Sequence, residues 1–134
     1  MKLAYVLPLL TVVFAAEAHA SEVQVQLRAY VPTSCDMSFS PKVERLTDSS
    51  FSIGSIQQFC NTNYQLTLYH AAIGSGSEFG FGDRIVAAGA GSTVLQSSGR
   101  PTIATKQLIA RGLDAGSAEA LSHSMMLQVT PLAL

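Results

Sequence analysis

The chain has 134 residues, a formal net charge of −1 at pH 7 and only 13% charged residues. This length indicates one domain, and the balanced charge without a basic patch argues against nucleic acid as a partner. Tryptophan is absent, and a composition rich in Ser, Thr, Gln, Gly and Ala favours an exported structural protein over a cytosolic enzyme.

Residues 1–20 have the features of a secretory signal peptide. Lys2 precedes an apolar run over residues 3–16, and the stretch ends in Ala-His-Ala, so we expect cleavage after Ala20. A transmembrane anchor is the alternative, but the uncharged run is shorter than the roughly 20 residues that span a bilayer. The expected mature protein is therefore a single domain over residues 21–134.

Residues 21–35 alternate strictly between apolar and polar side chains. The apolar face consists of Val23, Val25, Leu27, Ala29 and Val31. Successive side chains of a strand point to opposite faces, so this pattern predicts an extended segment with one face built to be buried. That face packs either in the protein's own sheet or in a neighbouring copy.

Cys35 and Cys60 are the only cysteines, and both follow the signal peptide. An even cysteine count in an exported chain predicts one disulfide. Closing this loop restricts the unfolded chain and contributes roughly 3 to 4 kcal/mol. We expect no metal or other cofactor, because no CxxC spacing occurs and only His70 and His123 remain to complete a site.

Two further segments follow the first cysteine. Met37 and Phe39 are expected to extend a strand beyond it, whereas the rest of residues 40–50, with a proline and several serines, is expected to be a connection. Residues 50–60 are the next expected strand, in which Gly54 indicates a bulge or a bend.

The middle of the chain combines one clear strand with a glycine-rich stretch. Residues 61–63 (Asn-Thr-Asn) predict a turn, and residues 64–71 alternate again. The expected inner face of that strand consists of Tyr64, Leu66, Leu68 and His70. Residues 73–83 contain four glycines and are expected to hold no long regular element.

The last third predicts short elements separated by turns. Residues 84–96 are expected to form two short strands around a glycine turn, with a short helix as the alternative. A strand is expected over residues 105–113 and a single helical turn over residues 118–121. Residues 124–130 alternate once more, and Pro131 is expected to stop the pairing. The pattern as a whole predicts an all-β protein of two packed antiparallel sheets.

Four segments, VQVQLRAYVPTSC, FCNTNYQLTL, GDRIVAAG and MMLQVTP, carry a family resemblance. Together with the signal peptide and the cysteine spacing, they resemble the spore coat protein U family and the related pilin subunits of archaic chaperone-usher systems. The resemblance covers most of the mature chain. It implies an immunoglobulin-like β-sandwich that lacks its last strand and so exposes an apolar groove.

The same resemblance implies a function and a set of partners. A periplasmic chaperone would first lend a strand to the groove, and the N-terminal segment of the next identical or related subunit would replace it at the outer-membrane usher. The subunits would thereby form a fimbria on the cell surface. Carried onto this chain, Cys35 and Cys60 would join the first strand to the next, and residues 21–33 would be the donated segment.

Two features depart from the pattern of that family. The chain ends in Pro-Leu-Ala-Leu, where the resemblance leads us to expect an aromatic residue at the end of the last strand. In addition, one short segment cannot serve both as a donated strand and as a complete first strand. Donation is our main assignment for residues 23–31, and an ordinary first strand of a closed sandwich is the alternative.

The sequence contains no catalytic motif and offers one alternative to a structural role, which is ligand binding. No G-x-S-x-G motif occurs, and neither His70 nor His123 has an evident carboxylate neighbour in sequence, so we expect no enzymatic activity. The alternative function is a secreted, stand-alone binding module for carbohydrate or surface adhesion. Its stacking surface would consist of Tyr64, Tyr69, Phe79 and Phe81, although the two phenylalanines would equally fit the end of a core.

Overall fold

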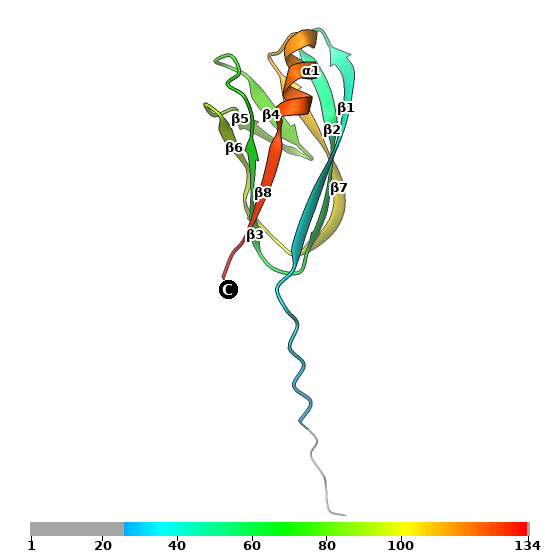
Figure 1. The fold of residues 1–134 in the computed structure, drawn as a ribbon, viewed down its shortest axis with the longest axis vertical. Helices are drawn as coiled ribbons and strands as arrows, with labels where there is room; N and C mark the ends of the chain where they lie inside the picture. The colour runs from blue at the N-terminus through cyan, green and yellow to red at the C-terminus, as the bar shows by residue number, and fades with distance from the viewer. Residues whose placement is uncertain (1–25, 134) are drawn as a thin grey trace, which may run out of the picture. The chain divides into compact units, whose positions relative to one another are not determined.

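The computed structural model describes residues 26–133, which form two antiparallel β-sheets and one α-helix (Figure 1). Residues 26–34 belong to no strand, and all of them are exposed. The elements are β1 (Cys35–Thr47), β2 (Ser50–Cys60), β3 (Tyr64–Tyr69), β4 (Glu78–Phe81), β5 (Arg84–Ala87), β6 (Ser92–Gly99), β7 (Thr102–Arg111), α1 (Ala115–Ser124) and β8 (Met126–Pro131).

The two sheets pack face to face around a single core. One sheet has five strands in the order β1-β2-β7-β4-β5, and the other has three in the order β6-β3-β8. Their inner faces are built from the alternate apolar positions of each strand. The largest of these buried side chains are Tyr64, Phe79, Phe81, Ile53, Ile56, Leu66, Leu68, Leu95, Leu108 and Leu121. The predicted pair of packed antiparallel sheets is confirmed.

Strand β1 is much longer than expected, because residues 40–47 continue it instead of forming a connection. It is an edge strand paired only with β2, so Pro41, which has no N–H to donate, interrupts no second ladder. The predicted irregularity at Gly54 is confirmed by a register shift between Ser52 and Gly54. An added Cβ at Gly54 would overlap the carbonyl of Ser40, so only glycine fits.

The glycine-rich stretch contains a strand that the sequence did not predict. Glu78–Phe81 forms β4, which pairs with β5 and β7. Phe79 and Phe81 are fully buried, and Gly80 lies against the Ile109 side chain. Burial of two aromatic rings outweighs the conformational cost of one glycine in a strand.

The two short strands expected over residues 84–96 are present as β5 and β6, so the alternative helix is absent from that region. They do not form a hairpin. Strand β5 pairs with β4 in the five-stranded sheet, and β6 pairs with β3 in the other. The turn around Gly89 and Gly91 therefore carries the chain from one sheet to the other.

Helix α1 spans ten residues, where a single turn over residues 118–121 was expected. It begins after Asp114, whose Oδ1 accepts a hydrogen bond from the Ser117 N–H at 2.8 Å while Oδ2 accepts one from the Ser117 hydroxyl at 2.9 Å. Ala118 and Leu121 are buried against the core. Within residues 26–133, no helix has the length and hydropathy needed to cross a membrane.

Strand β8 matches the predicted alternating segment, but pairing continues through Pro131, contrary to expectation. Pro131 is aligned with Tyr64 at the end of the β3 ladder, and the following Leu132 N–H donates to the Asn63 carbonyl at 2.7 Å. An edge strand tolerates proline at a position whose nitrogen faces away from its only ladder.

Candidate functional site between the edges of β1 and β8

Strands β1 and β8 are the edges of the two sheets on the same side of the sandwich (Figure 1). Each pairs with one neighbour, β1 with β2 and β8 with β3, and no ladder joins the two within the described chain. Each strand therefore presents one row of backbone N–H and C=O groups that makes no ladder hydrogen bonds. We call this open side the β1–β8 seam.

The core is incompletely covered along the β1–β8 seam. On the inner strands of both sheets the core side chains are fully buried, whereas those on the seam are only partly buried. The partly buried set on the seam consists of Cys35, Met37, Phe39 and Val43 from β1, and Met125, Leu127 and Val129 from β8 and the residue before it. A β-strand that is added to a sheet forms hydrogen bonds with unpaired backbone groups at the sheet edge and packs against nearby apolar side chains. The seam offers both.

The disulfide joins the start of β1 to the end of β2. Cys35 and Cys60 are opposite each other in the ladder, with 4.1 Å between their α-carbons. This confirms the predicted Cys35–Cys60 pairing and fixes β1, the seam's own edge, to the interior of its sheet.

Asn61 fixes the chain just before β1, a role that sequence reasoning missed because it assigned this residue only to a turn. Its Oδ1 accepts a hydrogen bond from the Ser34 N–H, and its Nδ2 donates to the Pro32 carbonyl, both at 2.8 Å. The Asn61 N–H also donates to the Ser34 carbonyl at 3.0 Å. Three hydrogen bonds thus hold residues 32–34 against the β2–β3 turn.

The predicted donor residues fall partly outside the described chain. Val23 and Val25, like the expected signal peptide, lie outside residues 26–133. Leu27 and Val31 are 92% and 72% exposed, and Ala29 is exposed as well. Residues 26–34 are in neither sheet, so the first strand of the sandwich begins at Cys35.

The aromatic surface expected for a stand-alone binding module is not formed. Tyr64, Phe79 and Phe81 are buried in the core, and only Tyr69 is exposed. The other interpretation of Phe79 and Phe81, in which they cover the core, is correct. The glycines beside them form a strand and a tight turn instead of an open loop.

His70 is part of the interior and is held by hydrogen bonds to uncharged groups. Its Nδ1 is 2.8 Å from the Ala71 carbonyl, which can only accept, so Nδ1 donates this hydrogen bond. Nε2 lies 2.9 Å from the Thr93 Oγ1, which itself accepts from the Gly89 N–H at 3.0 Å. The ring also packs against Phe79 at 5.1 Å. These contacts assign His70 to the packing of the sandwich.

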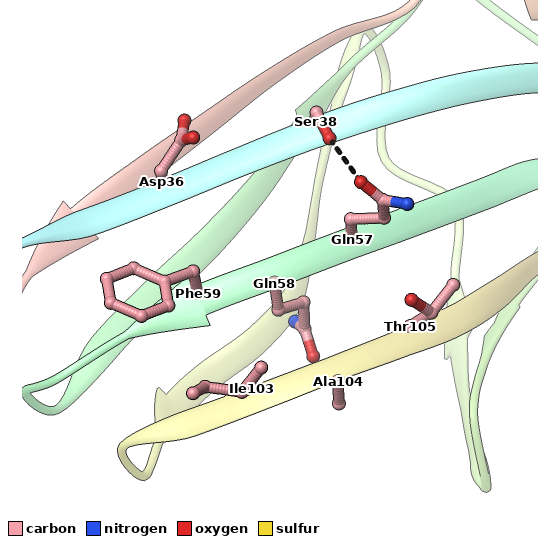
Figure 2. Close-up of a pocket in the computed structure, with 8 residues that line it drawn as sticks. All are labelled: Asp36, Ser38, Gln57, Gln58, Phe59, Ile103, Ala104 and Thr105. Carbon is pink, nitrogen blue, oxygen red and sulfur yellow. Dashed lines mark hydrogen bonds between the residues drawn. The ribbon is translucent and has the colours of Figure 1, made fainter.

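A hollow of about 490 Å³ lies on the outer face of the five-stranded sheet, away from the β1–β8 seam. Figure 2 shows Phe59 beside Ile103, its ladder partner on β7, with Asp36 on the neighbouring strand. The hydroxyl of Ser38 donates to the Gln57 amide oxygen at 3.4 Å. The lining contains one exposed apolar pair and one acidic side chain, Asp36, so this face gives little basis for selecting a ligand.

Among residues 26–133, no group of three or more His, Cys, Asp or Glu side chains lies close enough together to hold a metal ion.

No protein-family model matches the chain, and comparisons with curated proteins and with solved structures find no match.

Proposed function

We propose that this protein is a structural, non-enzymatic subunit of an extracellular fibre of the pilus or fimbria type. The β1–β8 seam would accept a strand from another copy, and the N-terminal segment would be donated to the next. The resemblance to spore coat protein U and archaic chaperone-usher pilins supports this proposal. On that basis the sandwich is immunoglobulin-like and lacks one strand, and a periplasmic chaperone and an outer-membrane usher are its partners before it reaches the cell surface.

The observation that carries the proposal is that two open strand edges and an exposed, alternating segment occur in one chain. The seam offers two unpaired edges above half-buried apolar side chains. Residues 26–31 offer alternating apolar side chains that are exposed and in no sheet. A strand added at the seam would satisfy the backbone groups of both edges and cover the apolar side chains between them.

Burial of the donor face provides enough free energy for a persistent fibre. A fully buried valine or leucine contributes roughly 1.5 to 3 kcal/mol. The five predicted donor residues, one of them only an alanine, together give on the order of 7 to 12 kcal/mol before the cost of ordering the segment. That range is sufficient for long-lived association without a covalent bond.

The hydrogen bonds of Asn61 favour donation to another copy over insertion into the same subunit. To pair with β1 of its own chain, the segment would have to reverse direction in a hairpin whose turn is formed by residues 32–34. The backbone groups of Pro32 and Ser34 are instead bound to Asn61. Self-insertion would break these bonds, whereas insertion into a neighbour leaves them intact.

Expression in a periplasm with a cognate chaperone, followed by electrophoresis without boiling, tests the proposal. The wild type should form a ladder of polymers that collapses on boiling. Leu27→Asp should abolish the ladder, because a carboxylate on the donor face would be buried at the seam. Gln26→Asp, on the opposite face of the same segment, is the matched control and should preserve it. A wild-type protein that remains a single monomeric band, or a ladder that persists in Leu27→Asp, contradicts the assignment.

A further inference from the structure

A second hollow, of about 330 Å³, lies at the turn between β6 and β7, away from the β1–β8 seam. Arg100 comes from this turn, Lys106 from β7 and Gln96 from β6. Because β6 and β7 belong to different sheets, the hollow lies where the two sheets meet. We call it the β6–β7 pocket.

The β6–β7 pocket contains two cations without a carboxylate partner. The ion pairs of lysine and arginine within residues 26–133 join Lys42 to Glu44 and Arg45 to Asp48, and none involves Arg100 or Lys106. Lys106 follows the alternation of the buried Leu108, so its stem faces the interior and is half-buried. Its Nζ lies 5.0 Å from the centre of the Phe81 ring, a weaker partner for an ammonium group than an anion.

Gln96, which lines the same pocket, has a side-chain oxygen without a donor. Oε1 of Gln96 is buried, and no group in the described chain donates to it. Leaving a buried carbonyl oxygen unpaired is costly, and a ligand hydroxyl would satisfy it. Ser98 and Thr102 add two hydroxyl groups to the lining, each able to donate or accept.

These features select one kind of ligand. Inorganic phosphate or sulfate would satisfy the cations but offers few or no donors to Gln96 Oε1. A neutral sugar would donate to Gln96 but leave Arg100 and Lys106 unpaired. A sugar acid satisfies both, with its carboxylate on the cations and its hydroxyls on Gln96, Ser98 and Thr102. The volume is at the lower end of the range of about 300 to 1,000 Å³ found for small-molecule sites, which suits a single ring.

We propose that the β6–β7 pocket binds one uronic acid residue of an acidic polysaccharide. The site does not depend on the proposed function, because its residues are separate from the β1–β8 seam and a monomer suffices to test it. In a fibre, many copies would each present one such site, so a weak interaction per subunit would add up along a polysaccharide chain.

Titration of the full chain with D-glucuronate, followed by the backbone amide resonances of the non-proline residues within 98–102, tests this proposal. Glucose and inorganic phosphate are the comparison ligands. We expect glucuronate to shift these resonances with an affinity at least tenfold above that of either comparison ligand. Arg100→Gln and Gln96→Leu should each weaken glucuronate binding about tenfold, the equivalent of one hydrogen bond.

Arg84→Gln is the matched control, because it removes the same charge from a residue outside the pocket and should leave the affinity unchanged. Arg100 is exposed, so we expect Arg100→Gln to fold, and this variant tests the proposal even if Gln96→Leu does not fold. Equal binding of phosphate and glucuronate, equal binding of glucose and glucuronate, or no shift at residues 98–102 would each overturn the proposal.

Discussion

The ring of Tyr64 occupies the space where a side chain would begin at Gly99, its partner across the β3–β6 ladder. Tyr64 is only 1% exposed, so its ring must shift within the packed interior to make room. We therefore expect Gly99→Ala to lower the free energy of unfolding by about 1 to 3 kcal/mol, the usual cost of overpacking. Urea unfolding measures this change. Gly74→Ala, at a position with no atom within 4 Å of the added Cβ, is the control and should have a much smaller effect.

Tyr64 also makes stability depend on alkaline pH. Burial raises the pKa of its hydroxyl above 10.0, and the hydrogen bond from Gln58 Nε2, at 3.2 Å, acts in the opposite direction. Because the folded-state pKa is raised, this contribution to stability is present below pH 10 and is lost as the pH rises through the folded-state value. Tyr64→Phe should remove this part of the alkaline decline.

At neutral pH, Tyr64→Phe should itself cost about 1 to 3 kcal/mol, because it leaves the buried Gln58 amide without its partner. Denaturant unfolding between pH 8 and pH 11 measures both effects. The exposed Tyr69→Phe is the control for the substitution. An alkaline slope identical in wild type and Tyr64→Phe would show that other groups cause the decline.

Asp114 produces the opposite dependence at acid pH. Hydrogen bonds from the N–H and hydroxyl of Ser117 lower the pKa of its carboxyl below 3.8. Its contribution to the start of α1 is therefore present above that value and is lost as the pH falls through the lower, folded-state pKa. Thermal unfolding of Asp114→Ala should show a clear loss of stability at pH 7 and a smaller one near pH 2. Asp114→Asn, which can still cap the helix, should lose less at pH 7.

The disulfide should account for a large share of the stability of the sandwich. The Cys35–Cys60 bond closes a loop with a sequence separation of 25 residues, for which chain entropy gives roughly 3 to 4 kcal/mol. We expect the double variant Cys35→Ser, Cys60→Ser to lose about this amount in denaturant unfolding. Reduction of the wild type by dithiothreitol should reproduce the loss, and a double variant as stable as the oxidised protein would contradict the expectation.

Side-chain alternation made several elements predictable from sequence. Strands β3 and β8 bury the residues that a period of two placed inside, including the half-buried Leu127 and Val129 on the seam. The disulfide was predictable because only one intrachain pairing of the cysteines exists. These features depend only on the local alternation of side chains and on the number of cysteines, so the sequence was sufficient to predict them.

Features that depend on tertiary contacts were missed. Strand β4 is built on a glycine-rich sequence whose two phenylalanines find cover only in the folded core. The second half of β1 contains Pro41 and charged residues, which are acceptable only on an edge with one ladder. Helix α1 has few apolar residues and depends on its cap and on the burial of Leu121. Asn61 and Lys106 have no local pattern, because their partners are distant in sequence. Gln96 is placed at the β6–β7 pocket only by the folding of the two sheets.

The bonds between Asn61 and residues 32–34 determine how mechanical tension would enter the molecule. A pull on residues 26–31 first meets these three hydrogen bonds and then Cys35, from which the covalent bridge carries the load into β2. An edge strand would otherwise peel away one rung at a time from the pulled end. Here the outermost pair of the ladder is a covalent bond, so a pull on this end does not peel β1 from β2.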